Sequence, residues 1–114
     1  MTKKIIVGLT EKVKIETKEG KKRTIKAKVD TGASKSSIDV NLAKKLKLGP
    51  VIRKKIIKSA HGNRLRPIIK VTVELAGKKF KKEFTLADRR HLKTRVLIGV
   101  NVLKKGFLVD PSKK

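Results

Sequence analysis

Hydrophobic and polar positions along the chain recur mostly with the two-residue period of β-strands. A short apolar run at 5–9 and an alternating segment at 13–16 precede the turn Glu19-Gly20-Lys21, and a second alternating segment follows at 24–29. Such alternation is typical of strands that bury one face. The first third of the chain therefore predicts a β-hairpin.

One short helix is expected after this hairpin. Asp39 is a suitable N-cap for a helix over 40–48, in which Leu42 and Leu46 stand four residues apart, and Gly49-Pro50 closes the segment. An N-cap oxygen accepts a hydrogen bond from an otherwise unpaired N–H of the first turn. The pattern therefore predicts a helix with a defined start and a defined end.

The middle of the chain returns to the pattern of strands. β-branched runs at 51–58 and 66–75 are joined by a segment at 59–63 that contains the Gly and Asn a hairpin turn favours. A further hairpin turn is expected at Ala76-Gly77-Lys78. Two more hairpins are therefore predicted.

The last third is also mainly strand. Phe80 and Phe84 have helical spacing, but the alternation that resumes at Phe84 favours a strand. A buried strand is expected at 95–99, and a helical turn at 102–105 precedes a final apolar segment at 107–109. The prediction is a mainly β fold with one or two short helices.

Length and composition limit the alternatives. A chain of 114 residues with no linker or internal repeat is expected to form one domain, 1–114. No apolar run approaches the roughly 18 residues that span a bilayer, so we expect a cytoplasmic protein without membrane contact. Without cysteine, and with only His61 and His91 as imidazoles, we expect no disulfide, metal or cofactor.

An Asp-Thr-Gly-Ala turn follows the second predicted strand. Lys28-Val29-Asp30-Thr31-Gly32-Ala33-Ser34 is followed by Ser36-Ser37-Ile38 and then by the predicted helix. This series of strand, turn, strand and short helix resembles the signature of the retropepsins. The resemblance implies a small retropepsin-like (acid protease) β-barrel.

The second half of the chain is similar to a narrower family. Segments 57–62, 66–69, 84–89, 96–99 and 107–112 resemble the retropepsin-like family named ATP-dependent zinc proteases, some of which accompany an ATP-grasp ligase that glutamylates a ribosomal protein. The sequence contains no Gly-x-x-x-x-Gly-Lys-Ser/Thr phosphate loop and no cluster of zinc ligands. We therefore expect neither ATP nor zinc chemistry.

The resemblance implies catalytic roles for three residues of the turn. Asp30 would be the catalytic carboxylate, Thr31 would brace the partner loop through its hydroxyl, and Gly32 would allow close backbone approach. Aspartic-protease chemistry requires two carboxylates about 3 Å apart that share one proton. The chain contains one Asp-Thr-Gly, so catalysis would require a homodimer.

The resemblance also implies the surroundings of the turn. The hairpin around His61 to Asn63 would be the flap, and 97–99 would be the hydrophobic-Gly segment that packs behind the turn. Val100 stands where relatives commonly carry Arg, which removes an ion pair near the active-site loops. The structural alternative is that Asp30 serves only the hydrogen bonds of a tight turn.

Charge adds a second functional hypothesis. Lys and Arg total 33 against 9 acidic residues, so the net charge is +24. The abundance of Lys, Ile and Val is thermophile-like, but the Glu that normally accompanies Lys in ion-pair networks is scarce. Without Tyr or Trp there is no stacking platform for single-stranded bases. We therefore expect the protein to contact the phosphate backbone of structured RNA and to recognise its shape.

The candidate nucleic-acid contacts are basic residues that cluster at predicted turns, in the helix and at strand edges. They are Lys21, Lys22, Arg23, Lys44, Lys45, Arg53, Lys54, Lys55, Lys58, Arg64, Arg66, Lys78, Lys79, Arg89 and Arg90. Those at 53–55, 64 and 66 are favoured because one pair of neighbouring strands would group them.

Two functions follow. The first is a basic protein that binds rRNA among neighbouring ribosomal proteins, ribosome-associated and not an enzyme, in which Asp30 is structural. The alternative is a homodimeric aspartic endopeptidase. Two bodies of +24 about 25 Å apart repel by about 100 kcal/mol in unscreened water, and by several kcal/mol at physiological ionic strength, which opposes the dimer. A protein that coats double-stranded DNA would have the same sequence pattern, because phosphate contacts carry no base information.

Overall fold

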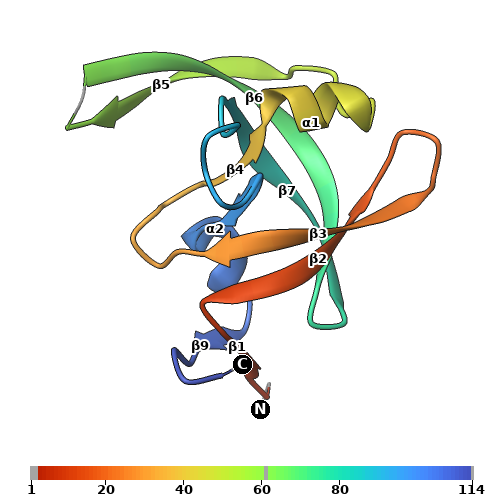
Figure 1. The fold of residues 1–114 in the computed structure, drawn as a ribbon, viewed down its shortest axis with the longest axis vertical. Helices are drawn as coiled ribbons and strands as arrows, with labels where there is room; N and C mark the ends of the chain where they lie inside the picture. The colour runs from red at the N-terminus through yellow and green to blue at the C-terminus, as the bar shows by residue number, and fades with distance from the viewer. Residues whose placement is uncertain (1–2, 61, 114) are drawn as a thin grey trace.

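Six strands form a closed barrel in the computed structural model, which describes residues 3–60 and 62–113 (Figure 1). Around the barrel they run in the order β2 (Thr10–Glu16), β3 (Lys22–Val29), β8 (Val96–Ile98), β4 (Ser36–Asp39), β7 (Lys78–Ala87) and β6 (Gly62–Leu75). Pairing of β2 with β6 closes the ring. The predicted mainly β barrel with two short helices is confirmed.

The first hairpin forms where the alternating pattern predicts it. β2 and β3 pair antiparallel, with Val13 opposite Ile25, and the chain reverses at the expected Gly20 turn. Val13 and Ile15 are wholly buried, whereas Lys12 and Lys14 between and beside them face solvent. Burial of alternate side chains on the inside of the barrel is the force that sets this register.

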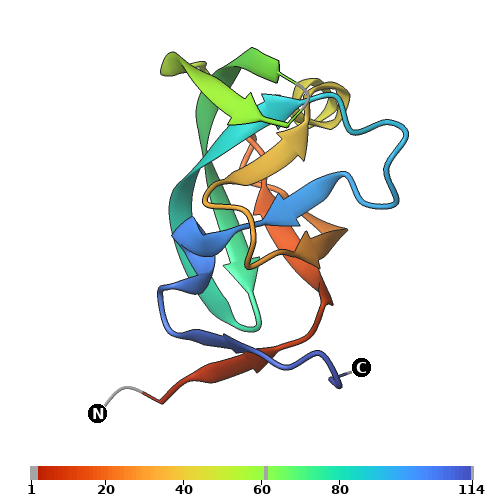
Figure 2. The ribbon, with the colours of Figure 1, turned by 90° about the vertical axis from the view of Figure 1, so that its left-hand side faces the viewer.

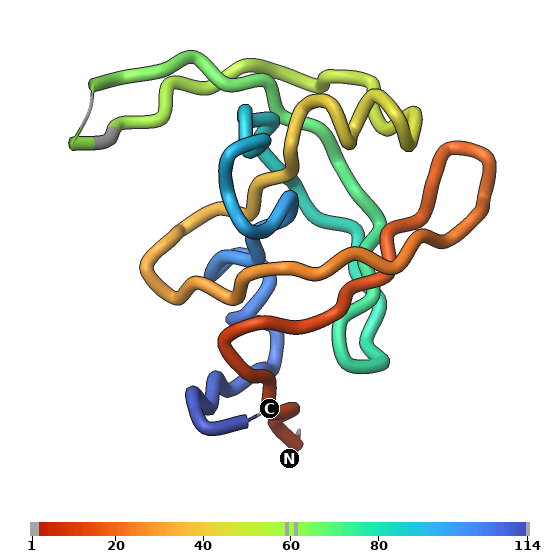
Figure 3. Tube along the Cα trace, in the orientation of Figure 1, coloured from red at the N-terminus to blue at the C-terminus, as the bar shows by residue number. Residues whose placement is uncertain are grey.

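Strand β6 is 14 residues long and belongs to two parts of the molecule. From Ile68 onwards it pairs with β7 and buries its apolar side chains in the barrel. Its first half leaves the barrel and pairs with β5 (Arg53–Ser59), so that residues 53–60 and 62–67 form a projecting hairpin, here called the arm (Figures 1 and 3). The arm projects into solvent, and even its apolar side chains Ile56 and Leu65 are 58% and 60% exposed.

Strand β8 lies between β3 and β4 and determines the place of the Asp30 loop. β3 pairs with it in parallel, Val29 opposite Ile98, whereas β4 pairs with it antiparallel, Ile38 opposite Val96. The chain between β3 and β4 must therefore cross the end of β8. The Asp-Thr-Gly-Ala turn lies on this crossing, against the segment that leaves β8.

Both helices differ in extent from the prediction. Helix α1 (Val40–Lys45) starts at the predicted cap, where Asp39 Oδ2 accepts a hydrogen bond from the N–H of Leu42 at 3.1 Å, but it ends before 48. Lys47 has φ 56°, and the N–H of Leu48 returns to the carbonyl of Ala43, so the chain leaves the helical path there. Helix α2 (Val100–Leu103) starts two residues before the predicted turn.

The two ends of the described chain form a separate sheet beneath the barrel. β1 (Ile5–Val7) and β9 (Phe107–Val109) pair in parallel (Figures 1 and 2). Ile6 and Leu108 are opposite each other in register, and both are about half exposed, at 52% and 53%. Among the described residues no helix is long and apolar enough to cross a membrane.

Candidate active site

The Asp-Thr-Gly turn is held in a defined shape by its own hydrogen bonds. Asp30 Oδ1 accepts a hydrogen bond from the N–H of Gly32 at 2.8 Å, and the carbonyl of Asp30 accepts one from the N–H of Ala33 at 3.3 Å. The N–H of Asp30 donates to the carbonyl of Ile98 at 2.9 Å, which attaches the turn to the end of β8. Thr31 and Gly32 are exposed, and Asp30 is partly exposed.

The segment after β8 passes directly beneath this turn. The N–H of Val100 donates to the carbonyl of Ala33 at 2.8 Å. A Cβ on Gly99 would lie 2.7 Å from that same carbonyl oxygen and closer still to the carbonyl of Lys35. Only glycine allows the two backbones to approach so closely. Gly99 therefore allows the Asp-Thr-Gly-Ala turn to pack closely against the segment that leaves β8.

A buried polar network joins the strand after the turn to helix α2. Ser36 is wholly buried; its Oγ donates to Asn101 Oδ1 at 2.7 Å and accepts from the N–H of Gly99 at 2.9 Å. Asn101 Nδ2 donates to the carbonyl of Glu83 on β7 at 2.9 Å. Every polar atom of this network has a partner, so it fixes β4, β7 and α2 relative to the turn.

Asp39 supports the other side of the site. Its buried carboxylate accepts from the N–H of Arg89 at 2.8 Å and from Arg95 Nη1 at 3.4 Å. The guanidinium of Arg89 donates to the carbonyl and hydroxyl of Thr94 at 3.1 and 3.2 Å. Burial lowers the pKa of Arg89, and the charges of Asp39 and Asp30 act in the opposite direction. Arg89 therefore carries a positive charge close to the Asp30 turn.

Two cavities lie on either side of Leu97, beside the turn. The first, about 340 Å³, is bounded by the turn, β4, β7 and the arm, and its basic lining residues are Lys35, Lys58 and Arg66. The second, about 530 Å³, has Leu9, Thr10, Lys28, Arg89, Leu92, Lys93 and Thr94 around it. We call the two together the cleft. Among the described residues, no carboxylate lines either half, so the cleft is cationic with apolar walls.

The arm overhangs the turn, as the resemblance implies for a flap (Figures 1 and 3). Ile57 and Arg66 of the arm line the first cavity together with Gly32 and Ala33. His61, at the expected tip of the flap, lies outside the described residues. The arm also brings together the five favoured cations, Arg53, Lys54, Lys55, Arg64 and Arg66, and a further candidate, Lys58, lies on the same hairpin.

The other predicted nucleic-acid contacts lie in several places. Lys21, Lys22 and Arg23 are at the β2–β3 turn, Lys44 and Lys45 are on α1, and Lys78 and Lys79 start β7. Lys22 pairs with Glu74 at 3.7 Å, Lys79 with Glu16 at 3.2 Å, Arg90 with Asp88 at 3.0 Å, and Arg53 with Glu83. Lys78 Nζ donates to the carbonyl of Lys105 at 2.6 Å and lies over the rings of Phe80 and Phe107.

Arg89 differs most from its predicted place. It was expected at the surface with Arg90, but only 8% of it is exposed, and its guanidinium is engaged with Thr94. The buried Asp39 nearby provides the negative charge that makes this burial tolerable. The sequence carries no local signal of this, because Asp39 and Arg89 are 50 positions apart.

Sequence reasoning also missed the side chains that hold the turn. Ser36 is part of the retropepsin-like series of motifs but was given no role there, and its partner Asn101, 65 positions away, belongs to no local pattern. Lys28, Lys35 and Lys93 line the cleft without belonging to any of the predicted basic clusters. For Lys28 a weak signal exists, because it immediately precedes Val29 and the Asp-Thr-Gly-Ala turn.

Solved structures with the same fold include two viral proteases and a protein of unknown function. EIAV protease, complexed with the inhibitor HBY-793, has a TM-score of 0.67 and 22% identity, over 91% of this chain and 88% of that one. Simian foamy virus protease has a TM-score of 0.61 and 18% identity, over 83% and 91%. A protein of unknown function from Legionella pneumophila has a TM-score of 0.66 and 21% identity, over 96% and 94%. The fold is therefore that of the retropepsin-like aspartic proteases.

A family model gives the narrower assignment. Residues 41–114 match the RimB-like family, described as retropepsin-like aspartic endopeptidase RimB, and the chain belongs to this family. The match begins after Asp30, so the family model does not cover the turn. No sequence among the curated proteins matches the chain. Within the described residues, no group of three or more His, Asp or Glu side chains could hold a metal ion.

Proposed function

We propose that the chain is one subunit of a homodimeric aspartic endopeptidase. The observation that carries the proposal is the Asp30 turn, which is partly exposed and hydrogen-bonded to the end of β8, and whose Gly32 and Ala33 line the first cavity of the cleft together with residues of the arm. The single Asp-Thr-Gly supplies half of a catalytic pair, and a second copy supplies the other half.

In this reaction the two Asp30 carboxylates share one proton. The ionised carboxylate removes a proton from water as the water oxygen bonds to the scissile carbonyl carbon, and the protonated one donates to the carbonyl oxygen. The carboxyl that took the proton from water then gives it to the leaving nitrogen as the C–N bond breaks, and the other carboxylate removes a proton from a hydroxyl of the intermediate, which yields the product carboxylic acid and restores the shared proton. Gly32 N–H, which donates to Asp30 Oδ1, fixes the orientation of the carboxylate.

The cleft favours a peptide with acidic side chains. Apolar walls from Ile57, Leu92 and Leu97 accept the body of a peptide, and Lys28, Lys35, Lys58, Arg66 and Lys93 face it with positive charge. An acidic substrate also reduces the repulsion between two subunits of +24. Bound substrate therefore stabilises the dimer that cleaves it.

The test is cleavage of peptide libraries by wild type and by Asp30→Asn, measured by mass spectrometry. Wild type should cleave acidic peptides faster than basic ones of equal length, and the variant should lose activity completely while keeping its thermal unfolding temperature. Cleavage that survives in Asp30→Asn, or a wild type that remains monomeric and inactive at high salt and high concentration, would sink the proposal.

A second candidate function is binding to structured RNA. The arm supports it, because among its described residues Lys54, Lys55, Lys58, Arg64 and Arg66 make no ion pair with a carboxylate, and the whole chain has a net charge of +24. Sedimentation of cell lysate through a gradient at low and high salt tests it. Co-migration with a ribosomal particle at low salt and release at high salt is the expected result; recovery at the top of both gradients would refute it.

A further inference from the structure

A second cationic surface lies on the outer face of strands β6 and β7, beside the base of the arm, where Arg53 contacts Glu83. A cavity of about 290 Å³ there is lined by Lys35, Lys70, Lys81, Lys82, Glu83, Asn101 and Lys104. We call it the lysine groove. Lys70 and Lys81 also line a neighbouring cavity of about 150 Å³, which continues towards Lys18 and Lys47. Lysines from the turn after β3, from β6, from β7 and from the end of α2 therefore meet in one place.

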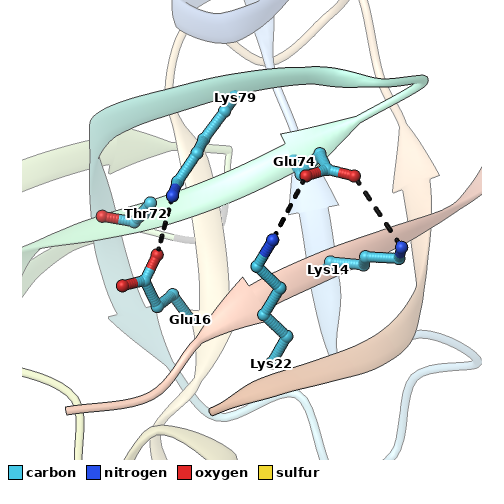
Figure 4. A pocket seen from close by; sticks show the side chains of 6 residues that line it. All are labelled: Lys14, Glu16, Lys22, Thr72, Glu74 and Lys79. Atoms are coloured by element: carbon cyan, nitrogen blue, oxygen red, sulfur yellow. Dashed lines mark ion pairs between the residues drawn. The ribbon is translucent and has the colours of Figure 1, made fainter. Parts of the chain in front are cut away.

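On the described part of this face of the sheet, the lysines at one end pair with carboxylates, whereas the lysines of the groove do not. At its far end Glu74 pairs with Lys14 and Lys22 at 3.9 and 3.7 Å, and Glu16 pairs with Lys79 at 3.2 Å (Figure 4). These carboxylates lie among the lysines they neutralise. Two carboxylates there face three lysines, so most of the positive charge of that part of the sheet is compensated.

In the lysine groove the carboxylate is already engaged. Glu83 is the one acidic residue of its lining, and it accepts two hydrogen bonds from the guanidinium of Arg53, one of them at 2.8 Å to Nη1. That contact lowers the pKa of Glu83, and the positive charges of Lys35 and Lys70 lower it further. Among the described residues, none of the five groove lysines forms an ion pair with a carboxylate within 4 Å.

The groove lysines also repel their neighbours. Partial burial lowers the pKa of Lys82, and the charges of Lys105 and Lys104 lower it further. Like charges at close range are destabilising unless an anion lies between them. A ligand with several closely spaced negative charges would relieve this repulsion, and the lysines are arranged on a surface that such a ligand can reach.

The lining distinguishes the groove from the cleft. The cleft has apolar walls that suit peptide side chains, whereas every residue that lines the groove is Lys, Glu or Asn. Protein and peptide ligands normally anchor through buried apolar or aromatic side chains. A nucleic-acid backbone needs only cations and hydrogen-bond donors, and Lys and the Asn amide provide these.

We propose that the lysine groove binds the phosphodiester backbone of structured RNA, which deepens the second candidate function and rests on it. Lys70, Lys81 and Lys104 each contact a phosphate, and the binding is independent of sequence, because the groove offers no aromatic platform for bases. None of these three residues is among the candidate contacts named from the sequence, although Lys81 and Lys104 each stand beside another lysine. They come from three separate segments that only the folded sheet and α2 bring together.

The test compares two triple variants of the full chain that remove equal charge. The groove variant is Lys70→Gln/Lys81→Gln/Lys104→Gln, and the matched control is Lys4→Gln/Lys12→Gln/Lys26→Gln, whose residues are exposed and lie outside the groove. The probes are a fluorescent 20-base-pair RNA duplex, the DNA duplex of the same sequence, and a polyglutamate peptide. Fluorescence anisotropy gives Kd at several salt concentrations, and circular dichroism confirms folding.

Three lost phosphate contacts should reduce the slope of log affinity against log salt by about 2.7, which is a loss on the order of 100-fold at 0.15 M salt. The control should lose less than about 5-fold. An equal loss of RNA affinity in both variants would refute the groove as the binding site without refuting RNA binding itself. Tighter binding of polyglutamate or DNA than of RNA would also refute the groove as an RNA site. A wild type that binds none of the duplexes would remove the second candidate function itself. Asp30→Asn should bind RNA as wild type does.

Discussion

Replacing Ser36 by alanine tests whether the buried network holds the Asp30 turn. Ser36 is 0% exposed, and its Oγ is the acceptor for the N–H of Gly99 and the donor to Asn101 Oδ1. Ser36→Ala leaves the Gly99 N–H buried without a partner, which costs about 1–3 kcal/mol, and it removes one further hydrogen bond of about 1 kcal/mol. We expect the free energy of unfolding to fall by about 2–4 kcal/mol.

Urea unfolding measures this change, and at an m-value of about 1.5 kcal/mol/M the midpoint should fall by about 2 M. The matched control is Ser37→Ala, because Ser37 is the next residue of β4, is only partly buried and lines the cleft. It should change stability by less than about 0.5 kcal/mol. Measurements at two protein concentrations separate any contribution of dimerisation.

Hydrogen exchange provides a second, local readout. The Gly99 amide should exchange faster in Ser36→Ala than in wild type, because its acceptor is lost. A loss of less than about 1 kcal/mol, or an equal loss in Ser37→Ala, would refute the reasoning that this network supports the turn.

Three further predictions follow from the structure. Gly99→Ala should destabilise the fold by more than about 3 kcal/mol in thermal unfolding. The new Cβ would collide with two backbone carbonyls, which cannot move without displacing the turn. A soluble variant of wild-type stability would contradict this contact. The association constant of the dimer, measured by analytical ultracentrifugation, should rise about 100- to 1,000-fold as salt increases from 0.15 to 1 M. The reason is that salt screens most of the repulsion between two chains of +24. A dimer that weakens with salt would show that attractive charges dominate its interface. Arg90 holds the pKa of Asp88 at about 2 through side-chain hydrogen bonds. The stability that Asp88 contributes is therefore present above its ordinary pKa and lost as pH falls towards 2. Arg90→Gln should raise the pKa of Asp88 towards 3.8 in an NMR titration, and an unchanged pKa would mean that the pair does not form in solution.

The order of strands and turns was predictable because it depends on local pattern. The alternation at Val13 and Ile15, the turn at Gly20 and the N-cap at Asp39 all appear where the sequence places them. Helix ends were less accurate. α1 stops before Lys47, whose φ of 56° comes from the packing of the following segment and has no signal in helix propensity.

In the candidate site, too, features that depend on neighbouring residues were predictable, and contacts between distant residues were not. Asp30, Thr31 and Gly32 were named as candidates because the contiguous Asp-Thr-Gly resembles the retropepsin signature, and the hydrogen bonds of their turn are local. Arg89 was misplaced at the surface, since its burial depends on Asp39, which is distant in the sequence. The lysine groove was missed because Lys70, Lys81 and Lys104 belong to separate segments. Lys81 and Lys104 each stand beside another lysine in the sequence, but nothing in the sequence shows that they meet Lys70 in one place.

By itself the sequence determined the strand pattern, the Asp-Thr-Gly turn and the large positive charge, because each follows from residue type and short spacing. Only the tertiary structure decided which cations are free to bind a ligand. Glu74 and Glu16 pair with three lysines at one end of the outer sheet face, while Glu83 is held by Arg53 and, within the described chain, forms no ion pair with the lysines of the groove. The reason is physical: ion pairs form between side chains within about 4 Å, and those distances are set by strand register and closure of the barrel rather than by sequence separation.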